Sequence, residues 1–350
     1  MRKVLFEKRY VVILCSLTIM LGFLFTLPLK AISAEKVINW NLSVWGGKRA
    51  WTKPLHEWAA DMEKKTNGGW KIKIHYGAVL APPKEALDGI RAGMFEAAAI
   101  CCAYTPGKVP LHTVAELPFI APDTNINIFR MTAELWKHPA LKRELLKWNA
   151  VPLLSAGLCQ YHLMGNKAVR TAEDLVGARI RMGGEIGKVL AAAGAVPTLV
   201  PAPEVYESLS RGTIDLVGFP WTYAYGAYKI HEVSKFVTVP ISLGTMNCPY
   251  IASKDAWDVL PAKFKEYHME WYRKSPEVWA AEYQEADDKW MPIFKQKLEF
   301  IDFPRSERDK LVAKAEDFYE AWVKAREKEG LPGKDVLDYY LKKRKELTGY

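Results

Sequence analysis

The sequence is poor in cysteine and lacks the short motifs that mark common catalytic and metal sites. Five cysteines among 350 residues are too few for a disulfide scaffold. No CxxC pair occurs, so neither a zinc knuckle nor a thioredoxin site is predicted. GxSxG, HExxH, GxGxxG and P-loop motifs are absent as well. We therefore expect no catalytic residue, no metal ligand set and no cofactor, although a constellation assembled only in space stays open.

The sequence also lacks clusters of basic residues interleaved with aromatic ones. The formal charge is +9, but basic and acidic residues alternate along the predicted helices. A nucleic-acid partner is therefore not expected, whereas a mildly positive protein attracts small anions. With 49% hydrophobic and 25% charged residues, the composition is globular, and the length fits two domains.

One long apolar run is present, at the N-terminus. Four basic residues within positions 1–9 precede the run at 11–27, and small residues follow at 31–34. This order is typical of an export signal that is cleaved after Ser33 or Ala34. An uncleaved membrane anchor is the alternative, although 17 residues are few for a spanning helix. We read Cys15 as part of the signal, and not as a lipid attachment site. Removal of residues 1–34 lowers the formal charge to +5, because the segment holds five basic side chains and one acid.

Four cysteines lie beyond this signal. Cys101 and Cys102 are neighbours, and a bridge between neighbours is strained. Burial as small apolar side chains is the first interpretation for all four. A Cys159–Cys248 disulfide stays open.

Hydrophobic patterning predicts an α/β fold. Residues 37–102 read as strand, helix, strand, helix, strand, which indicates a parallel sheet covered by helices. After a helical stretch at 126–148, strands are expected at 151–156, 178–182, 196–200 and 213–217, with helices at 185–193 and 203–211. Residues 261–350 are expected to be mostly helical. Two α/β lobes without a floppy linker indicate a hinged pair with a cleft between them.

Arg181 stands at the end of a predicted strand, just before two glycines and a helix start. Ligands commonly bind at this end of the strands in an α/β sheet. A guanidinium there can hold a carboxylate through two parallel hydrogen bonds, and the first amides of the helix add donors. The alternative is a solvated charge at a strand end.

Aromatic residues follow strand 213–217 at the analogous position. They are Phe219, Trp221 and Tyr223. Such residues belong to the core more often than they form a ligand platform.

Several motifs in order resemble the extracytoplasmic solute receptors of TRAP transporters, the DctP family. They are TAEDLVGARIRM at 171–182, GAVP at 194–197, EVYESLSRGTID at 204–215 and EVSK at 232–235. The resemblance extends over residues 37–330.

This resemblance implies a periplasmic-binding-protein-like fold with two α/β lobes, a central ligand cleft, a hinge and long C-terminal helices. Lobe I would comprise residues 35–159 and 247–287, and lobe II residues 160–246 and 288–350. It implies a periplasmic protein that binds a small organic acid, without catalysis, and delivers it to the membrane-embedded permease subunits. It also implies that Arg181 clamps the carboxylate of the ligand.

Two positions depart from the sugar-acid and dicarboxylate receptors of this family. Tyr161 stands where a second arginine is expected, and Phe219 stands where an asparagine is expected. A cleft with one arginine and several aromatic residues favours an apolar or aromatic monocarboxylate, including 2-oxo and 2-hydroxy acids. A second carboxylate without a partner would be costly to desolvate.

Five further contacts are expected on topological grounds. Trp45 and Tyr104 follow strands of lobe I, and Gln160 can hydrogen-bond a 2-oxo or 2-hydroxyl group. Trp221 and Tyr223 either stack on the ligand or pack at the hinge. A secreted enzyme that acts on a small carboxylate and a ligand-sensing partner of a signalling receptor are the alternative functions.

Overall fold

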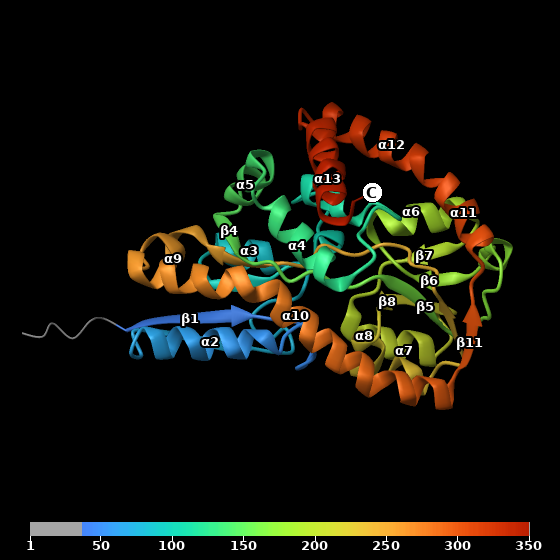
Figure 1. Ribbon diagram of the computed structural model, residues 1–350, viewed down its shortest axis with the longest axis horizontal. Coiled ribbons are helices and arrows are strands. Elements are labelled where there is room, and N and C mark those ends of the chain that lie inside the picture. The colour runs from blue at the N-terminus through green and yellow to red at the C-terminus, as the bar shows by residue number, and fades with distance from the viewer. Residues whose placement is uncertain (1–36, 350) are drawn as a thin grey trace, which may run out of the picture. The chain divides into compact units, whose positions relative to one another are not determined.

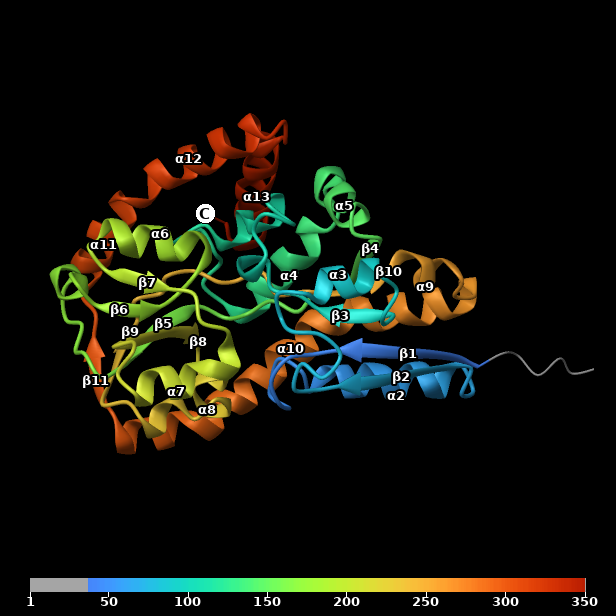
Figure 2. The same cartoon turned by 180° about the vertical axis from the view of Figure 1, so that it is seen from behind.

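The computed structural model describes residues 37–349 (Figures 1 and 2). The predicted export signal, its cleavage sites and Cys15 lie outside these residues. Residues 37–350 form one compact unit that contains two mixed β-sheets. Along the chain, the strands are β1 (Ile38–Ser43), β2 (Trp70–His75), β3 (Ala97–Ala99), β4 (Ala150–Leu154), β5 (Tyr161–Gly165), β6 (Arg179–Arg181), β7 (Val196–Thr198), β8 (Leu216–Pro220), β9 (Phe236–Val239), β10 (Tyr250–Ser253) and β11 (Glu299–Asp302).

The first sheet has the order β2-β1-β3-β10-β4, and its parallel part is β1, β2 and β3. The predicted β-α-β-α-β order of residues 37–102 is confirmed, with α2 (Pro54–Lys65) and α3 (Ala86–Arg91) as the two helices. Apolar residues of α2 and alternate residues of the strands share one core cluster. The opposite face is covered by α3 and α5 (Pro139–Leu146), which bury a second set of strand residues. The predicted helical stretch before β4 consists of α5 and α4 (Asn125–Leu135).

The second sheet has the order β11-β9-β5-β8-β6-β7. Helix α6 (Gly184–Ala192) covers one face, and α7 (Val205–Ser210) and α8 (Tyr223–Ala227) cover the other (Figures 1 and 2). Strand β5 runs antiparallel between β8 and β9, whereas β6 is parallel to both β7 and β8.

Three connections join the two sheets. Residues 155–160 lead from β4 to β5, and residues 240–249 lead from β9 to β10. Helix α10 (Ala262–Lys297) follows the short α9 (Lys254–Asp258) and leads to β11; it packs on α2 and α4 beside the first sheet and on α8 beside the second. The chain thus changes sheet three times, and the division into two lobes with the expected boundaries stays a prediction.

The C-terminal region is helical, as expected, except for β11. After β11 come α11 (Arg305–Ala313), α12 (Ala315–Lys328) and α13 (Gly333–Thr348). Helix α13 packs on α4 and buries Val336 and Tyr340 in a core cluster with Leu135. This end of the chain therefore returns from the second sheet to helices beside the first (Figure 1).

Candidate ligand-binding site

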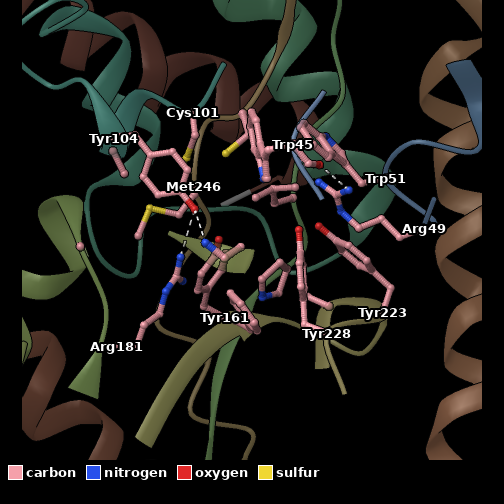
Figure 3. Close-up of a pocket in the computed structure, with 18 of the residues that line it drawn as sticks. Trp45, Arg49, Trp51, Cys101, Tyr104, Tyr161, Arg181, Tyr223, Tyr228 and Met246 are labelled. Carbon is pink, nitrogen blue, oxygen red and sulfur yellow. Dashed lines mark hydrogen bonds between the residues drawn. The ribbon is translucent and has the colours of Figure 1, made fainter. Parts of the chain in front are cut away.

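A cavity lies between residues of the two sheets (Figure 3). Seven of the 19 lining residues are aromatic, and the wall also contains two arginines and two cysteines. From the side of the first sheet it includes Trp45, Arg49, Trp51, Cys101, Tyr104 and Cys248, and from the side of the second sheet Tyr161, Arg181, Phe219, Tyr223 and Tyr228.

Arg181 is the last residue of β6, as expected, and only 4% of it is exposed. Its Nε donates to the Val200 carbonyl (2.8 Å) and its Nη1 to the Gly218 carbonyl (3.1 Å). The guanidinium carbon lies 4.6 Å from the centre of the Phe219 ring. Within residues 37–349 no carboxylate forms an ion pair with Arg181. A buried, oriented cation without an anion can hold the carboxylate of a ligand, and this role of Arg181 stays a prediction.

Tyr104 completes this end of the cavity from the other side. Its hydroxyl oxygen accepts from Nη2 of Arg181 (3.2 Å) and from the Ala202 amide (3.1 Å). Burial raises the pKa of Tyr104, so the hydroxyl keeps its proton. Because both of these bonds use the oxygen as acceptor, the hydroxyl hydrogen is available to an anion beside Arg181. Tyr104 follows β3 of the first sheet, and Ala202 follows β7 of the second. Tyr104 therefore lines the cavity and also joins the two sheets through this hydrogen bond.

Arg49 corrects the expectation of a cleft with one arginine. It is buried, it lines the cavity, and its Nη1 donates to the carbonyls of Trp45 (2.9 Å) and Gly47 (2.7 Å). Its guanidinium carbon lies 4.7 Å from the ring centre of Trp51 and 5.5 Å from that of Tyr228. Figure 3 shows Arg49 and Arg181 reaching the cavity from different sides. Arg49 also forms no ion pair within the part of the chain that the structure describes, so the cavity holds two cations.

The Tyr228 hydroxyl is buried and has no hydrogen-bond partner among the described residues. It approaches the backbone of Gly46 so closely that a Cβ there would lie 2.4 Å from its oxygen. Gly46 has φ +66°, a conformation that side-chain-bearing residues rarely adopt. A buried hydroxyl without a partner costs free energy unless a ligand satisfies it. Arg49 and Tyr228 therefore form a second polar end of the cavity.

Six of the eight residues expected at the site line this cavity. Besides Arg181 and Tyr104 they are Trp45, Tyr161, Phe219 and Tyr223. Phe219 lies within β8, which spans 216–220 and not the expected 213–217. Whether these residues contact a ligand stays a prediction.

Trp221 and Gln160 do not line the cavity. Trp221 packs against His162, Phe294 and Phe300. The Gln160 amide donates to the Pro122 carbonyl (3.0 Å) and accepts from the Gly244 amide (3.0 Å). Both side chains are engaged in the connections between the sheets, and their role as ligand contacts stays a prediction.

Sequence reasoning missed Arg49, Trp51, Tyr228 and the pair Cys101 and Cys248 as lining residues. Arg49 stands in the run GGKRA, which reads as a solvated turn. The Thr52 hydroxyl accepts from the Arg49 amide (3.0 Å) in a compact local turn, but this gives no signal in the sequence for the burial of the guanidinium.

Comparison with known proteins matches residues 43–325 to a family described as bacterial extracellular solute-binding protein, family 7 (DctP). A "solute-binding protein" of Albidiferax ferrireducens is 25% identical over 67% of this chain and 73% of its own length. A "monocarboxylate 2-oxoacid-binding periplasmic protein" of Nostoc is 25% identical over 63% of each chain. A "C4-dicarboxylate-binding periplasmic protein" of Rhodobacter capsulatus is 28% identical over 57% of this chain and 60% of its own.

Solved structures share the fold. A TRAP solute-binding protein of Rhodoferax ferrireducens with copurified benzoate has a TM-score of 0.79 at 18% identity, covering 89% of this chain and 99% of its own. A TRAP periplasmic solute-binding protein of Bordetella bronchiseptica with bound mandelate has a TM-score of 0.77 at 24% identity and the same coverage. The two-sheet fold with long C-terminal helices matches these proteins.

Proposed function

The chain belongs to family 7 of the bacterial extracellular solute-binding proteins, and we propose that it binds a carboxylate with an aromatic or apolar body for a TRAP-type permease. In this role it delivers the acid to the membrane subunits and performs no covalent chemistry. Two of its relatives are named as binding proteins.

A single observation carries this proposal: Arg181, buried and without an acidic partner among the described residues, faces a cavity walled by aromatic rings. The guanidinium and the free hydrogen of the Tyr104 hydroxyl provide donors for one carboxylate. Phe219, Trp45 and Tyr161 provide the apolar surface against which the rest of the ligand is buried.

Arg49 and Tyr228 refine the class of ligand. The argument against a second carboxylate rested on a cleft with a single arginine, but Arg49 lines the cavity as well. A ligand that carries an oxygen besides its carboxylate, in a 2-oxo, 2-hydroxyl or ring hydroxyl group, can form hydrogen bonds with the Tyr228 hydroxyl and with the guanidinium of Arg49. The 2-oxo acids and mandelate named for relatives fit this class, whereas benzoate has the aromatic body without a further oxygen; the C4-dicarboxylate of another relative is the competing choice.

Export to the periplasm belongs to the same proposal. Two of the relatives are named periplasmic. Within residues 37–349, no helix combines the length and apolarity needed to cross a bilayer. The N-terminal segment with the features of an export signal would direct the chain across the membrane and then be removed.

A thermal-shift screen of refolded mature protein tests the ligand class. Refolding removes ligand retained during purification, and the panel includes benzoate, mandelate, 4-hydroxybenzoate, phenylpyruvate, succinate and glucuronate. An acid that binds only the folded protein raises its melting temperature. We expect a rise with the aromatic acids. A rise with succinate or glucuronate alone would overturn the ligand class, and no rise with any acid would overturn the receptor assignment.

Arg181→Leu and Arg179→Leu form a matched pair for the same screen. Arg179 is two residues away on β6, but it is largely exposed and paired with Asp215 (2.5 Å). We expect Arg181→Leu to abolish the shift, a loss of at least about 100-fold in affinity, because a charged hydrogen bond in a desolvated site is removed. The Arg179→Leu variant should keep the rise in melting temperature. Equal affinity of the Arg181 variant and the parent would contradict the proposed clamp.

A further inference from the structure

Two cysteines in the wall of the cavity lie opposite each other just beyond the paired ends of β3 and β10. Strand β3 pairs antiparallel with β10, with Ala99 opposite Tyr250. The pairing continues beyond both strands, because the Ile100 amide donates to the Pro249 carbonyl (3.0 Å) and the Cys102 amide to the Asn247 carbonyl (2.9 Å). This register places Cys101 opposite Cys248.

Cys101 and Cys248 form a non-hydrogen-bonded pair, because no backbone hydrogen bond joins these two residues. The bonded positions are the flanking ones, at Ile100 with Pro249 and at Cys102 with Asn247. In such a pair the Cα atoms are about 4.5 Å apart and the side chains point to the same face. A disulfide requires a Cα separation of about 4.4 to 6.8 Å, so the backbone already meets this condition.

Both thiols of this pair are buried and free in the structure. Burial, and after it a hydrogen bond with the Cys101 thiol, raises the pKa of the Cys248 thiol well above its usual value. Both residues line the ligand cavity. Cys159 and Cys248, the bridge left open by the sequence, are not joined in the structure.

The other two cysteines of the described chain face elsewhere. Cys102 belongs to the core cluster on the opposite face of the first sheet, as strand alternation requires. The Cys159 thiol donates to the Trp221 carbonyl in a connection between the sheets. Neither competes for the contact between Cys101 and Cys248.

We propose that Cys101 and Cys248 form a cross-strand disulfide in the wall of the ligand cavity when the protein folds in an oxidising compartment. The two thiols lose two protons and two electrons, and one S–S bond forms. The electrons pass to a disulfide-bearing oxidant by thiol–disulfide exchange, which breaks the disulfide of the oxidant and returns it as a dithiol. Because both thiols are buried in the folded protein, this exchange takes place during folding, before the cavity closes.

The bridge would change the cavity as well as the fold. It removes two S–H groups from the wall and ties the end of β3 to the start of β10 across a loop of more than a hundred residues. Loops of this length give a disulfide its largest entropic effect on the unfolded chain. The oxidised protein should therefore melt at a higher temperature than the reduced protein.

The test compares full-length protein exported to a bacterial periplasm with mature protein made in a reducing cytoplasm. Free thiols are blocked with iodoacetamide under denaturing conditions, and peptides are mapped by mass spectrometry without reduction. We expect a peptide pair joined through Cys101 and Cys248, and an intact mass about 2 Da below that of the reduced form. Reduction with dithiothreitol should restore four reactive thiols in the mature chain.

Single serine variants provide the controls. Cys159→Ser should keep the bridge, whereas Cys101→Ser should lose it and leave Cys248 alkylated. Four alkylated cysteines in the exported protein would overturn the proposal, as would a bridge to Cys102 or Cys159. This readout needs no ligand, so it is independent of the outcome of the acid screen. If the bridge forms, benzoate titrations of the oxidised and reduced protein measure what it does to binding.

Discussion

At the scale of single residues, the site depends on two buried arginines with different surroundings. Arg181 has all three guanidinium nitrogens engaged, to Val200, Gly218 and Tyr104. Arg49 uses Nη1 for two backbone carbonyls and stacks near Trp51. Arg181 is thus held rigidly at the end of a strand, while Arg49 is held by the loop it helps to form.

The Arg49→Met variant should lose affinity mainly for acids that carry an oxygen in addition to the carboxylate. We expect affinity for 4-hydroxybenzoate or mandelate to fall about 10- to 100-fold, because a charge-assisted hydrogen bond is lost, and affinity for benzoate to fall less. Calorimetric titration measures both. Lys48→Met, at the exposed neighbouring position, is the matched control and should change neither. An equal loss of affinity for all three acids would show that Arg49 does not bind the oxygen that benzoate lacks.

Gly46→Ala should destabilise the protein through a defined contact. The new methyl would meet the Tyr228 hydroxyl at 2.4 Å, and φ +66° is unfavourable for alanine. We expect a loss of about 1–3 kcal/mol in unfolding free energy and weaker acid binding.

Gly47→Ala and Tyr228→Phe complete this test. A Cβ at Gly47 meets no atom within 4 Å, so that variant should behave as the parent. Combining Gly46→Ala with Tyr228→Phe removes the hydroxyl oxygen and should recover part of the lost stability. No recovery would assign the whole effect to the backbone.

At the scale of elements, periodicity predicted those strands and helices that have one clear face. The first five elements were predicted because β1, β2 and α2 alternate or repeat apolar residues regularly. Arg181 was placed at a strand end because two glycines follow the short strand β6. Strand β5 was missed because all five of its residues are buried and no alternation is visible. Strand β11 was missed because it is four residues long and lies between long helices. Arg49 could not be found because its burial arises from contacts with Tyr228, far away in sequence.

Helix packing at His268 should make stability depend on pH. His268 on α10 is buried; its Nδ1 accepts from Trp58 Nε1 of α2 (3.1 Å), and its ring also bonds the Leu153 backbone. Burial lowers the pKa of His268 to about 4, against 6.5 for the free side chain. As the pH falls, the His268 ring is therefore protonated in the unfolded state at a higher pH than in the folded state. Stability is fully present above pH 6.5 and is lost as the pH falls toward 4, by about 3 kcal/mol.

His268→Gln tests this contribution, because glutamine offers an acceptor and a donor but does not titrate. Urea unfolding at pH 7.5, 5.5 and 4.5 should show a shallower loss of stability in the variant. A remainder is expected from His162, whose pKa burial lowers to about 3. Identical pH profiles of the variant and the parent would contradict the assignment to His268.

At the scale of the whole molecule, export predicts a defined new N-terminus. Intact mass of protein recovered from a periplasm should correspond to a chain that begins at Ala34 or Glu35. Ala31→Phe should reduce cleavage after Ser33, because the position three residues before the cut requires a small side chain. Recovery of the full-length chain in the membrane fraction would instead support the uncleaved anchor.

The strand order of the first sheet carries a consequence for how the chain is made. Strand β10 lies between β3 and β4 in that sheet, although it follows β4 in the chain by about a hundred residues. The first sheet therefore cannot be completed until residue 253 is available, and the second sheet also waits for β11. A nascent chain of this topology has no complete domain to fold early, so it stays open while most of its length is synthesised. A chain in that state can still be threaded through a narrow pore, and folding of the receptor would then begin on the side where its ligand is found.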